Sequence, residues 1–347
     1  MIPIHYWRYT LRSTSALNAR SARTEHEGAL IRAEDGFGCI HPWPELGDAP
    51  LDEQLARLAR GDRTPVLAQA LCCARIDGEA RREASSLFVS GSGDPIPMPP
   101  SHLLAQPRDE PGEAWEAGFR VVKHKVGPDL SGLVEKLDPW VGAEFRIRLD
   151  ANETVSVGEW RGWWNRIPAA LRSAIDFVED PCPWSGQDWQ SLRDLGLPVA
   201  ADRDAEARGI AADVLVYKPA IDGEGKGGSE RELAGKAEKA GGVSGDVARS
   251  PALLPWEERC VEGGKRLVVT SVMDHALGQL WAAHRAAVLG LAAPHLLTDC
   301  GLLTHRCFEP DPFFDRIRTQ GPRLLPPPGT GLGFDDLLDK LPWKRLN

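Results

Sequence analysis

The sequence lacks the segments that direct a protein into or across a membrane. No apolar run is long enough to span a bilayer, and the opening residues, MIPIHYWRYTLRS, contain no apolar core of the kind that signal peptides have. The sequence also lacks a basic tract, and its formal net charge is −9. We therefore expect a cytoplasmic protein that has neither a membrane nor a nucleic acid as its partner.

Paired cysteines are missing as well. The seven cysteines are scattered, their number is odd, and none forms a C-x-x-C motif. This usage favours a reduced protein in which cysteines serve as small apolar residues. The 347 residues are 42% hydrophobic and 26% charged, which is ordinary for a globular protein with a large core. The length predicts about two domains, or one barrel with additions.

The N-terminal part of the chain predicts a small α+β unit. Residues 3–12 and 25–45 have the pattern of strands in a meander, with EDGFG as a turn. Residues 51–61 and 65–82 have helical patterns, and the first of these ends in glycine. The stretch SGSGDPIPMPP then interrupts regular structure, so we place a domain boundary near residue 94.

Short apolar strands alternate with helical segments through the rest of the chain. The strand candidates are PIPMPPSHLLA, FRVVKHKVG, FRIRLDAN, AIDFVEDP, LPVAADRD, VLVYKPA, RLVVTSVMD and PHLLTDCG. Alternating strands and helices indicate a parallel sheet with helices outside it, and this number of strands favours a (β/α)-barrel. A doubly wound open sheet is the alternative, but no strand candidate runs directly into a G-x-G-x-x-G turn.

Charged residues stand late in five consecutive strand candidates. They are Lys123 and Lys125, Asp150, Glu179, Asp202 and Lys218. The carboxyl ends of barrel strands meet at one mouth, so these side chains should converge there. Three bare carboxylates on neighbouring strands would repel one another, and a divalent cation removes that repulsion. An all-oxygen ligand set without His or Cys favours Mg²⁺ over zinc.

The lysines on either side of the carboxylates suggest acid–base chemistry. Lys125 and Lys218 would flank whatever the metal holds. A lysine that lies near a cation and is partly desolvated loses proton affinity, and Lys123 beside Lys125 would depress the pKa of Lys125 further. A metal ion, a carbonyl-type ligand and a neutral lysine together suit removal of a proton beside a carboxylate, with the metal stabilising the enediolate.

The motifs KHKVG, RLDAN, FVEDP and VYKPA resemble the enolase superfamily, in particular its muconate-lactonizing subgroup. The resemblance implies an α/β fold, a (β/α)7β TIM-type barrel with an N-terminal α+β capping domain that the C-terminal segment completes. TEHEGALIRAEDGFG is similar to the capping domain of this family, and PPGTGLGFDDLL is similar to its C-terminal return. The implied domains are a capping domain at residues 1–94, a catalytic barrel at 95–325 and a returning segment at 326–347.

Within this subgroup, GCIHPWPELGD, TSVMDHALGQLWAAH and LTDCGLLTHRCF resemble the o-succinylbenzoate synthases of menaquinone biosynthesis. The resemblance implies a carbon–oxygen lyase that dehydrates 2-succinyl-6-hydroxy-2,4-cyclohexadiene-1-carboxylate, a small anionic substrate, to 2-succinylbenzoate. Lys125 would remove the proton beside the carboxylate and then assist the loss of hydroxide. Lys218 would stabilise the enediolate from the opposite side, and Lys123 would tune Lys125.

The same resemblance implies a ligand set and substrate contacts. Asp150, Glu179 and Asp202 would bind Mg²⁺, for which Mn²⁺ can substitute. Asn152 and Arg148 stand where the family has supporting polar groups. The substrate-binding residues implied are Ser271, Met273 and Arg148.

Two stretches depart from the pattern of the subgroup. The fifth strand ends in ADRDAE, so Arg203 replaces an acid that is usual there. Asp202 is the first acid after the apolar run and is the expected ligand, whereas Asp204 should cap the following helix.

The connection from Gly223 to Lys265 is longer than one helix requires. RELAGKAEKAGG predicts the helix, and residues 243–265 predict a surface insertion that the chemistry does not need.

Three further segments have predicted places. Thr14–Ala22 is polar and small and suits a loop that closes over the substrate. His124 alternates away from the two lysines beside it, so its side chain should face the helix layer. The tryptophans of EWRGWWNRI recur at helical spacing and should pack against the barrel.

Two other functions remain open. An N-acylamino acid racemase or dipeptide epimerase would use the same pair of lysines, both as acid and base. A non-catalytic homologue would act as a binding protein without affinity for Mg²⁺. Incubation in D₂O separates the two reactions, because racemisation exchanges the α-proton of recovered substrate whereas dehydration consumes the substrate. The sequence does not predict the oligomeric state.

Overall fold

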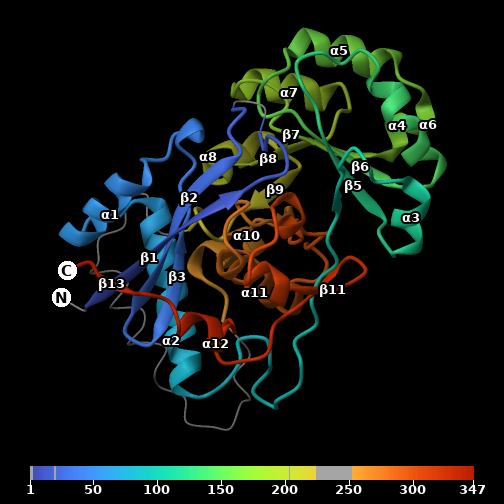
Figure 1. The fold of residues 1–347 in the computed structure, drawn as a ribbon. Coiled ribbons are helices and arrows are strands. Elements are labelled where there is room, and N and C mark those ends of the chain that lie inside the picture. The colour runs from blue at the N-terminus through green and yellow to red at the C-terminus, as the bar shows by residue number, and fades with distance from the viewer. Residues whose placement is uncertain (1–2, 19–20, 203, 224–251) are drawn as a thin grey trace.

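The computed structural model describes residues 3–18, 21–202, 204–223 and 252–347. Figure 1 shows an antiparallel sheet and its helices on one side of the molecule, a curved set of parallel strands and helices on the other, and both termini beside the antiparallel sheet. The predicted helix at RELAGKAEKAGG and the substituted position Arg203 lie outside the described residues.

The N-terminal sheet contains four antiparallel strands in the order β13–β1–β2–β3. Their bounds are Ile4–Arg12 for β1, Glu25–Ala33 for β2, Gly36–Ile40 for β3 and Lys344–Arg345 for β13. β1 pairs with β2 along its whole length, from Ile4 opposite Ala33 to Arg12 opposite Glu25. Because β13 pairs with β1, the C-terminal end of the chain becomes the edge of the N-terminal sheet.

Two helices cover one face of this sheet, where the sequence predicts them. α1, Leu51–Arg60, ends at Gly61, which has the positive φ of 85° that glycine adopts without strain. α2, Pro65–Arg82, starts with a proline at its first position, and the Thr64 side chain accepts a hydrogen bond from the Leu67 amide. Apolar residues of both helices pack on β1, β2 and β3 and close a small core.

The second sheet is parallel and contains seven strands in the order β10–β9–β8–β7–β6–β5–β4. Their bounds are β4 Leu103–Leu104, β5 Val121–Lys125, β6 Arg146–Asp150, β7 Ile175–Glu179, β8 Val199–Ala201, β9 Val214–Tyr217 and β10 Arg266–Val269. Single parallel bridges join Leu267 and Thr270 to the segment 297–301, and this segment bridges back to Ser101 beside β4. The segment therefore takes the eighth position and closes a TIM-type barrel, as the sequence predicts.

Helices follow the barrel strands and lie outside them (Figure 1). Their bounds are α3 Pro111–Glu116, α4 Leu133–Gly142, α5 Val157–Arg166, α6 Ala169–Ala174, α7 Gly186–Asp194, α8 Ala205–Arg208, α10 Pro255–Glu262 and α11 Ala276–Ala292. The three tryptophans of α5 are buried, and His124 packs edge-on against Trp140 of α4 at 5.4 Å, so both packing predictions are confirmed.

α11 is buried along almost its whole length, which fits its apolar sequence on all sides. It contacts β10 of the barrel and β3 of the N-terminal sheet, so it lies between the two units. The largest apolar cluster accordingly runs from Tyr9 and Phe37 of the N-terminal sheet to the barrel helices. The two units share one core, which holds the N-terminal sheet in a fixed position beside the barrel.

The chain returns from the barrel to the N-terminal unit through β11 Arg318–Gln320, β12 Arg323–Leu325 and α12 Asp335–Leu338. The fully buried Asp77 carboxylate of α2 accepts hydrogen bonds from the amides of Phe37 and Leu332, and it pairs with Arg81 at 2.6 Å. Arg81 also pairs with Asp335 of α12. These bonds hold the returning segment on α2, because a buried carboxylate is stable only when hydrogen-bonded.

The expectation of a surface insertion at residues 243–265 is wrong for the part that the structure describes. Residues 255–262 form α10, the helix between β9 and β10. Glu257 of α10 is fully buried, and Arg285 of α11 binds it through Nε at 2.8 Å and through Nη2. The Tyr217 hydroxyl of β9 donates to the same carboxylate at 3.1 Å. The helical spacing was weak in the sequence because α10 has only eight residues.

Replacing Arg285 with methionine is expected to lower the free energy of unfolding by about 3–5 kcal/mol, because it leaves a buried carboxylate without its cation. Urea unfolding measures the loss. The matched control is Arg57→Met, which breaks an exposed pair with Glu53 and should cost less than about 1 kcal/mol. Equal, small losses in both variants would contradict an anchoring role for the Glu257–Arg285 pair.

Deletion of residues 243–263 removes Glu257 and with it this anchor, so we expect the deletion to unfold the barrel.

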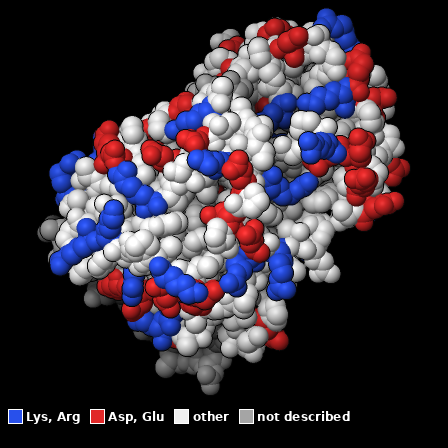
Figure 2. All heavy atoms as spheres, viewed as in Figure 1, with Lys and Arg blue, Asp and Glu red and all other residues white. Residues whose placement is uncertain are grey.

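The surface and the cysteines agree with the composition. Figure 2 shows acidic and basic side chains interspersed over the visible face. All seven cysteines lie in the described part of the chain, and each is a free thiol. Among the described helices, none combines the length and the apolar character that crossing a bilayer requires.

Candidate active site

A cavity of about 390 Å³ opens at the carboxyl ends of the barrel strands. The barrel provides most of its lining, and the N-terminal unit covers it with Leu17, Asn18, Trp43 and Leu46. The Trp43 indole donates a hydrogen bond to the Val272 carbonyl at 2.8 Å, which ties this cover to the loop after β10. The predicted closing loop at Thr14–Ala22 therefore reaches the cavity through Leu17 and Asn18; residues 19–20 are not described.

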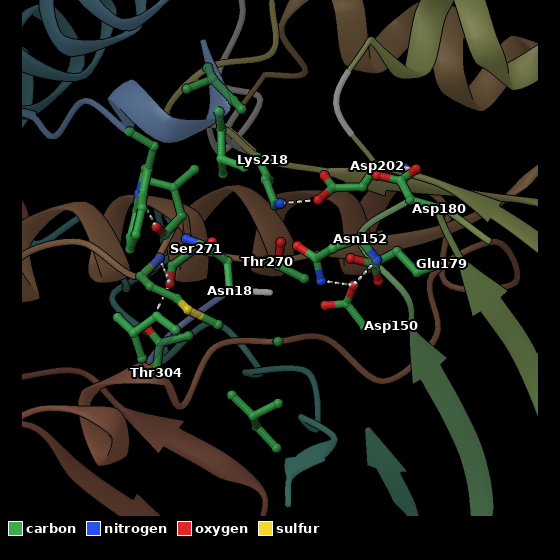
Figure 3. Close-up of a pocket in the computed structure, with 18 of the residues that line it drawn as sticks. Asn18, Asp150, Asn152, Glu179, Asp180, Asp202, Lys218, Thr270, Ser271 and Thr304 are labelled. Carbon is green, nitrogen blue, oxygen red and sulfur yellow. Dashed lines mark hydrogen bonds and ion pairs between the residues drawn. The ribbon is translucent and has the colours of Figure 1, made fainter. Parts of the chain in front are cut away.

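Three predicted carboxylates occupy one wall of this cavity. Asp150 ends β6, Glu179 ends β7, and Asp202 directly follows β8. Asp150 lies opposite Glu179 in the sheet register, and all three residues are buried. Figure 3 shows them on one side of the cavity, with Ser271 and Thr304 on the other. The common level at the rim follows from the parallel register, because each acid ends its strand.

Lys123 lies between two of these carboxylates. Its ammonium donates to both oxygens of Glu179 at 2.8 Å and lies 3.0 Å from Asp150. Burial opposes the charge of Lys123, but the charges of Asp150 and Glu179 outweigh burial and raise its pKa above the ordinary value. Lys123 is therefore a permanent cation in this wall.

Lys125 ends β5 and lies in the same cavity, but its ammonium makes no hydrogen bond or ion pair with any described residue. Burial lowers the pKa of Lys125, Asp150 opposes this effect, and the neighbouring charges of Lys123 and Lys218 lower the pKa further. Lys123 thus lowers the pKa of Lys125, as the sequence predicts. A half-buried lysine that has a depressed pKa and no partner among the described residues is suited to accept and return a proton.

Lys218 follows β9 and forms an ion pair with Asp202, which Figure 3 shows as a dashed line. The Asp222 carboxylate accepts a hydrogen bond from the Lys218 amide at 2.8 Å and so fixes the backbone at this point. Asn152 donates its side-chain amide to Asp150 at 2.5 Å. Lys125 ends β5 and Lys218 follows β9, and these two strands lie on either side of β6, β7 and β8.

The cavity lining contains an excess of negative charge. Eight acidic and five basic side chains line it. Burial, together with the charges of Asp150 and Asp202, raises the pKa of Glu179 to about 7 against the opposing effect of Lys123. Burial also raises the pKa of Asp180 well above its ordinary value, and Asp202 and Glu179 add to this effect. A further cation at this wall would relieve the repulsion.

The donor set fits a hard divalent cation, because Asp150, Glu179 and Asp202 offer only carboxylate oxygens and no His or Cys stands among them. Within the described residues, no three acidic, His or Cys side chains already converge as a metal cage. The carboxylates are instead directed at the ammonium groups of Lys123 and Lys218. These lysines supply the positive charge that the acidic wall needs in this arrangement.

Ser271 and Met273 line the cavity from the loop after β10, where the sequence predicts substrate contacts. The Ser271 hydroxyl lies 2.6 Å from the Thr304 hydroxyl and accepts a hydrogen bond from the Met273 amide at 3.2 Å. Met273 has a positive φ of 57°, which is uncommon for a residue with a side chain. The loop is therefore held in a defined conformation with its polar groups beside the cavity.

The substrate-contact expectation for Arg148 needs correction. Arg148 is fully buried, does not line the cavity, and pairs with Asp176 at 2.9 Å. Alternation along β6 points Arg148 and Asp150 to the same side, but Arg148 stands two residues earlier and so lies roughly 7 Å deeper. The side chain crosses beneath the cavity and reaches His102 and Thr298 on the far side of the barrel.

Several cavity residues were not predicted from the sequence. Asp180 follows Glu179 directly and accepts a hydrogen bond from the Asp202 amide at 3.2 Å. Arg208 of α8 pairs with Glu153 at 2.6 Å and lies 3.9 Å from Asp180. Adjacency to Glu179 was a signal for Asp180, but nothing in the local sequence marks Arg208. The sequence also did not predict that His102, Thr270 and Thr304 line the cavity.

The two acids of ADRD occupy different places. Asp202 is buried at the strand end, whereas Asp204 is exposed and has a positive φ of 56°. The backbone carbonyl of Asp204 accepts hydrogen bonds from the amides of Ala207 and Arg208, so Asp204 stands at the start of α8. Its position is the one that the sequence predicts for a helix cap, although both acids line the cavity.

Comparison with known proteins gives matches over the whole chain. Residues 4–80 match the family model of the O-succinylbenzoate synthase N-terminal domain. The chain is 33% identical over 361 residues to the o-succinylbenzoate synthase of Bdellovibrio bacteriovorus, covering 100% of this chain and 99% of the relative. It is 25% identical over 334 residues to the o-succinylbenzoate synthase of Yersinia enterocolitica, covering 87% of this chain and 92% of the relative.

Solved structures of the enolase superfamily share the fold. A member from Roseovarius nubinhibens complexed with magnesium aligns with a TM-score of 0.69 at 17% identity, covering 100% of this chain and 98% of the other. The dipeptide epimerase of Enterococcus faecalis, complexed with Mg and L-Leu-L-Tyr, aligns with a TM-score of 0.66 at 16% identity, covering 96% and 99%. At such low identity, the likeness to these structures shows the fold alone.

Proposed function

Because the chain belongs to the o-succinylbenzoate synthase family, we propose that it is a carbon–oxygen lyase that dehydrates 2-succinyl-6-hydroxy-2,4-cyclohexadiene-1-carboxylate to 2-succinylbenzoate. One observation supports the chemistry most directly. Lys125 is half-buried and has no partner among the described residues, and Lys218 pairs with Asp202. The two lysines stand at the ends of the strands on either side of three buried carboxylates. We place the reaction in cytoplasmic menaquinone biosynthesis.

Asp150, Glu179 and Asp202 would hold Mg²⁺, and Mn²⁺ is the expected substitute, because all three donors are carboxylates and the acidic wall carries excess negative charge. When bound, the ion would supply a Lewis acid for a substrate carboxylate and lower the energy of negative charge that develops on it. Asn152 donates to Asp150 and would orient that ligand.

Lys125 would act first as a base. Its amine takes the proton from the ring carbon that bears the carboxylate, and the electron pair of that C–H bond moves into the carboxylate to form an enediolate. Lys218 remains an ammonium group and stabilises this charge from the other side. Lys123 holds two of the carboxylates in place, and its nearby charge adds to the effect of burial in lowering the pKa of the Lys125 amine.

Lys125 would act next as an acid. The electron pair of the enediolate returns to form the ring double bond while the C–O bond to the ring hydroxyl breaks, and the Lys125 ammonium donates its proton to the leaving hydroxide. One substrate molecule therefore gives one 2-succinylbenzoate and one water, and Lys125 is again neutral. Formation of the aromatic ring makes this step favourable. Ser271 and Met273 stand on the opposite wall, where we propose that they contact the rest of the substrate.

The purified protein with Mg²⁺ and the cyclohexadiene substrate is expected to form 2-succinylbenzoate, which its aromatic absorbance reveals. In D₂O the substrate should disappear without return of deuterated substrate. Epimerisation, the activity of the similar dipeptide epimerase, would give a different result, because an epimerase exchanges the α-proton of a dipeptide that is then recovered. Exchange into an N-acylamino acid or dipeptide, with no dehydration, would replace the proposed function with racemisation. A chain that neither binds Mg²⁺ nor turns over either substrate would be non-catalytic.

A further inference from the structure

His102 lines the cavity on the wall opposite the carboxylates. It directly precedes β4, and the strand order places β4, segment 297–301 and β10 across the barrel from β6, β7 and β8. His102 keeps only 7% of its surface accessible. Its amide donates to the Cys300 carbonyl at 2.7 Å, so the backbone is tied to the eighth barrel position. A ligand held at the acidic wall would extend toward this residue.

The contact with Arg148 determines which nitrogen of His102 carries the proton. Arg148 Nη1 lies 2.9 Å from His102 Nδ1. A guanidinium group has only donors, so Nδ1 must be the acceptor in this pair. Burial lowers the pKa of His102 well below its ordinary value, and the charges of Arg148 and Lys123 add to this effect. The neutral ring therefore carries its proton on Nε2.

Arg148 is well placed to enforce this state. Its guanidinium is anchored by Asp176 at 2.9 Å, by the Thr298 hydroxyl at 3.0 Å and by packing over the Phe177 ring at 4.8 Å. It cannot lose its proton at any ordinary pH, so it cannot become an acceptor. Arg148 thus acts through His102 rather than on a ligand.

Gly301 lies beside the Cε1–Nε2 edge of His102, where any side chain at position 301 would crowd the ring. A Cβ atom on Gly301 would lie 3.2 Å from His102 Nε2, 3.0 Å from its Cε1 and 2.7 Å from Thr270 Cγ2. His102 Nε2 has no hydrogen-bond partner among the described residues, and the buried Thr270 hydroxyl oxygen also lacks one there. Because His102 lines the cavity and its Nε2–H has no partner among the described residues, this donor is available to a ligand oxygen.

We propose that His102 donates its Nε2–H to an oxygen of the succinyl arm of the substrate, and that Arg148 is the positioning residue that fixes this tautomer. The assignment rests on the proposed function for the identity of the ligand. The ring carboxylate belongs at the acidic wall, so the succinyl arm is the part that reaches β4 and segment 297–301. His102 then contributes to the distinction between this substrate and carboxylates that lack the arm.

Two substitutions separate the donor role from a purely structural one. The amide nitrogen of glutamine reaches the position of histidine Nε2, whereas the amide oxygen of asparagine reaches that of Nδ1. If His102 donates to the ligand, His102→Gln should bind 2-succinylbenzoate in the presence of Mg²⁺ nearly as well as wild type, and His102→Asn should bind it roughly three- to tenfold more weakly. If His102 serves only as the acceptor for Arg148, the order of the two variants reverses, and the proposal is overturned.

Calorimetry supplies these affinities, with benzoate as the ligand that lacks the succinyl arm. His102→Asn should leave benzoate affinity unchanged, so a parallel loss for benzoate would also contradict the proposal. His284→Gln is the matched control, since His284 is buried in α11 and hydrogen-bonded to the Leu87 carbonyl outside the cavity. Wild-type protein that fails to bind 2-succinylbenzoate contradicts the proposed function. If wild-type protein binds 2-succinylbenzoate and His102→Asn binds it equally well, only the assignment of His102 is contradicted.

A spectroscopic measurement tests the tautomer without any ligand. Long-range ¹H–¹⁵N spectra of protein labelled at its nine histidines distinguish the Nε2–H tautomer, the Nδ1–H tautomer and the imidazolium ion, and the signals lost in His102→Gln identify His102. We expect the Nε2–H pattern, with an Nε2–H proton that shifts when 2-succinylbenzoate binds. An Nδ1–H pattern or an imidazolium pattern would overturn the proposal.

Discussion

Lys125→Ala is expected to reduce turnover by roughly 10²–10⁴-fold while leaving the fold intact, because Lys125 supplies the general base and acid. The side chain makes no hydrogen bond or ion pair with any described residue, so its removal breaks no structural contact of that kind. The rate of 2-succinylbenzoate formation measures the effect, and circular dichroism checks the fold. kcat and kcat/KM should fall together, since the proton transfer occurs in the transition state.

The matched control for this variant is Lys136→Ala, which removes an exposed lysine of α4. It should leave the rate unchanged. Retention of more than about a tenth of wild-type activity in Lys125→Ala would remove Lys125 from the role of base. The pH dependence gives a second check. The base must be neutral, so kcat/KM should rise with pH through the depressed pKa of Lys125 and level off above it.

Asp202→Asn is expected to weaken Mg²⁺ binding severely, whereas Asp204→Asn is expected to change it little. Asp202 is buried at the level of Asp150 and Glu179, and loss of a direct ligand should exceed the roughly 10–100-fold loss that follows removal of an outer partner. Asp204 is exposed at the start of α8, where asparagine caps a helix as well as aspartate and tolerates a positive φ. Mg²⁺ titration of both variants by calorimetry measures the difference.

Thermal unfolding of the two variants serves as the control. Asp204→Asn should keep the wild-type midpoint. Asp202→Asn should unfold cooperatively, although its loss leaves the Lys218 ammonium without its partner carboxylate. If Asp204→Asn loses Mg²⁺ while Asp202→Asn retains it, the ligand of this strand is Asp204, and the assignment along the fifth strand is shifted by two residues.

The barrel and its acidic wall were predictable because both depend on local rules. A strand alternates its side chains with a period of two, and a parallel barrel brings every carboxyl end to one mouth. Charged residues such as Asp150, Glu179 and Lys218, each at the end of an apolar run, could therefore be assigned to one site before any contact was known. The same alternation placed His124 outside the barrel, against Trp140.

The depth of a side chain in the barrel, and its hydrogen-bond or ion-pair partner, could not be predicted in this way. Arg148 and Asp150 share one side of β6, yet one lies beneath the cavity and the other at its rim, because two residues along a strand shift a side chain by roughly 7 Å. The buried pair that anchors α10 joins Glu257 to Arg285 on another helix. The proton on His102 depends on a residue 46 positions away in the chain. Such contacts form only when the barrel closes, because closure brings distant strands within hydrogen-bonding distance. The spacing of residues along the sequence does not predict which of them will come this close.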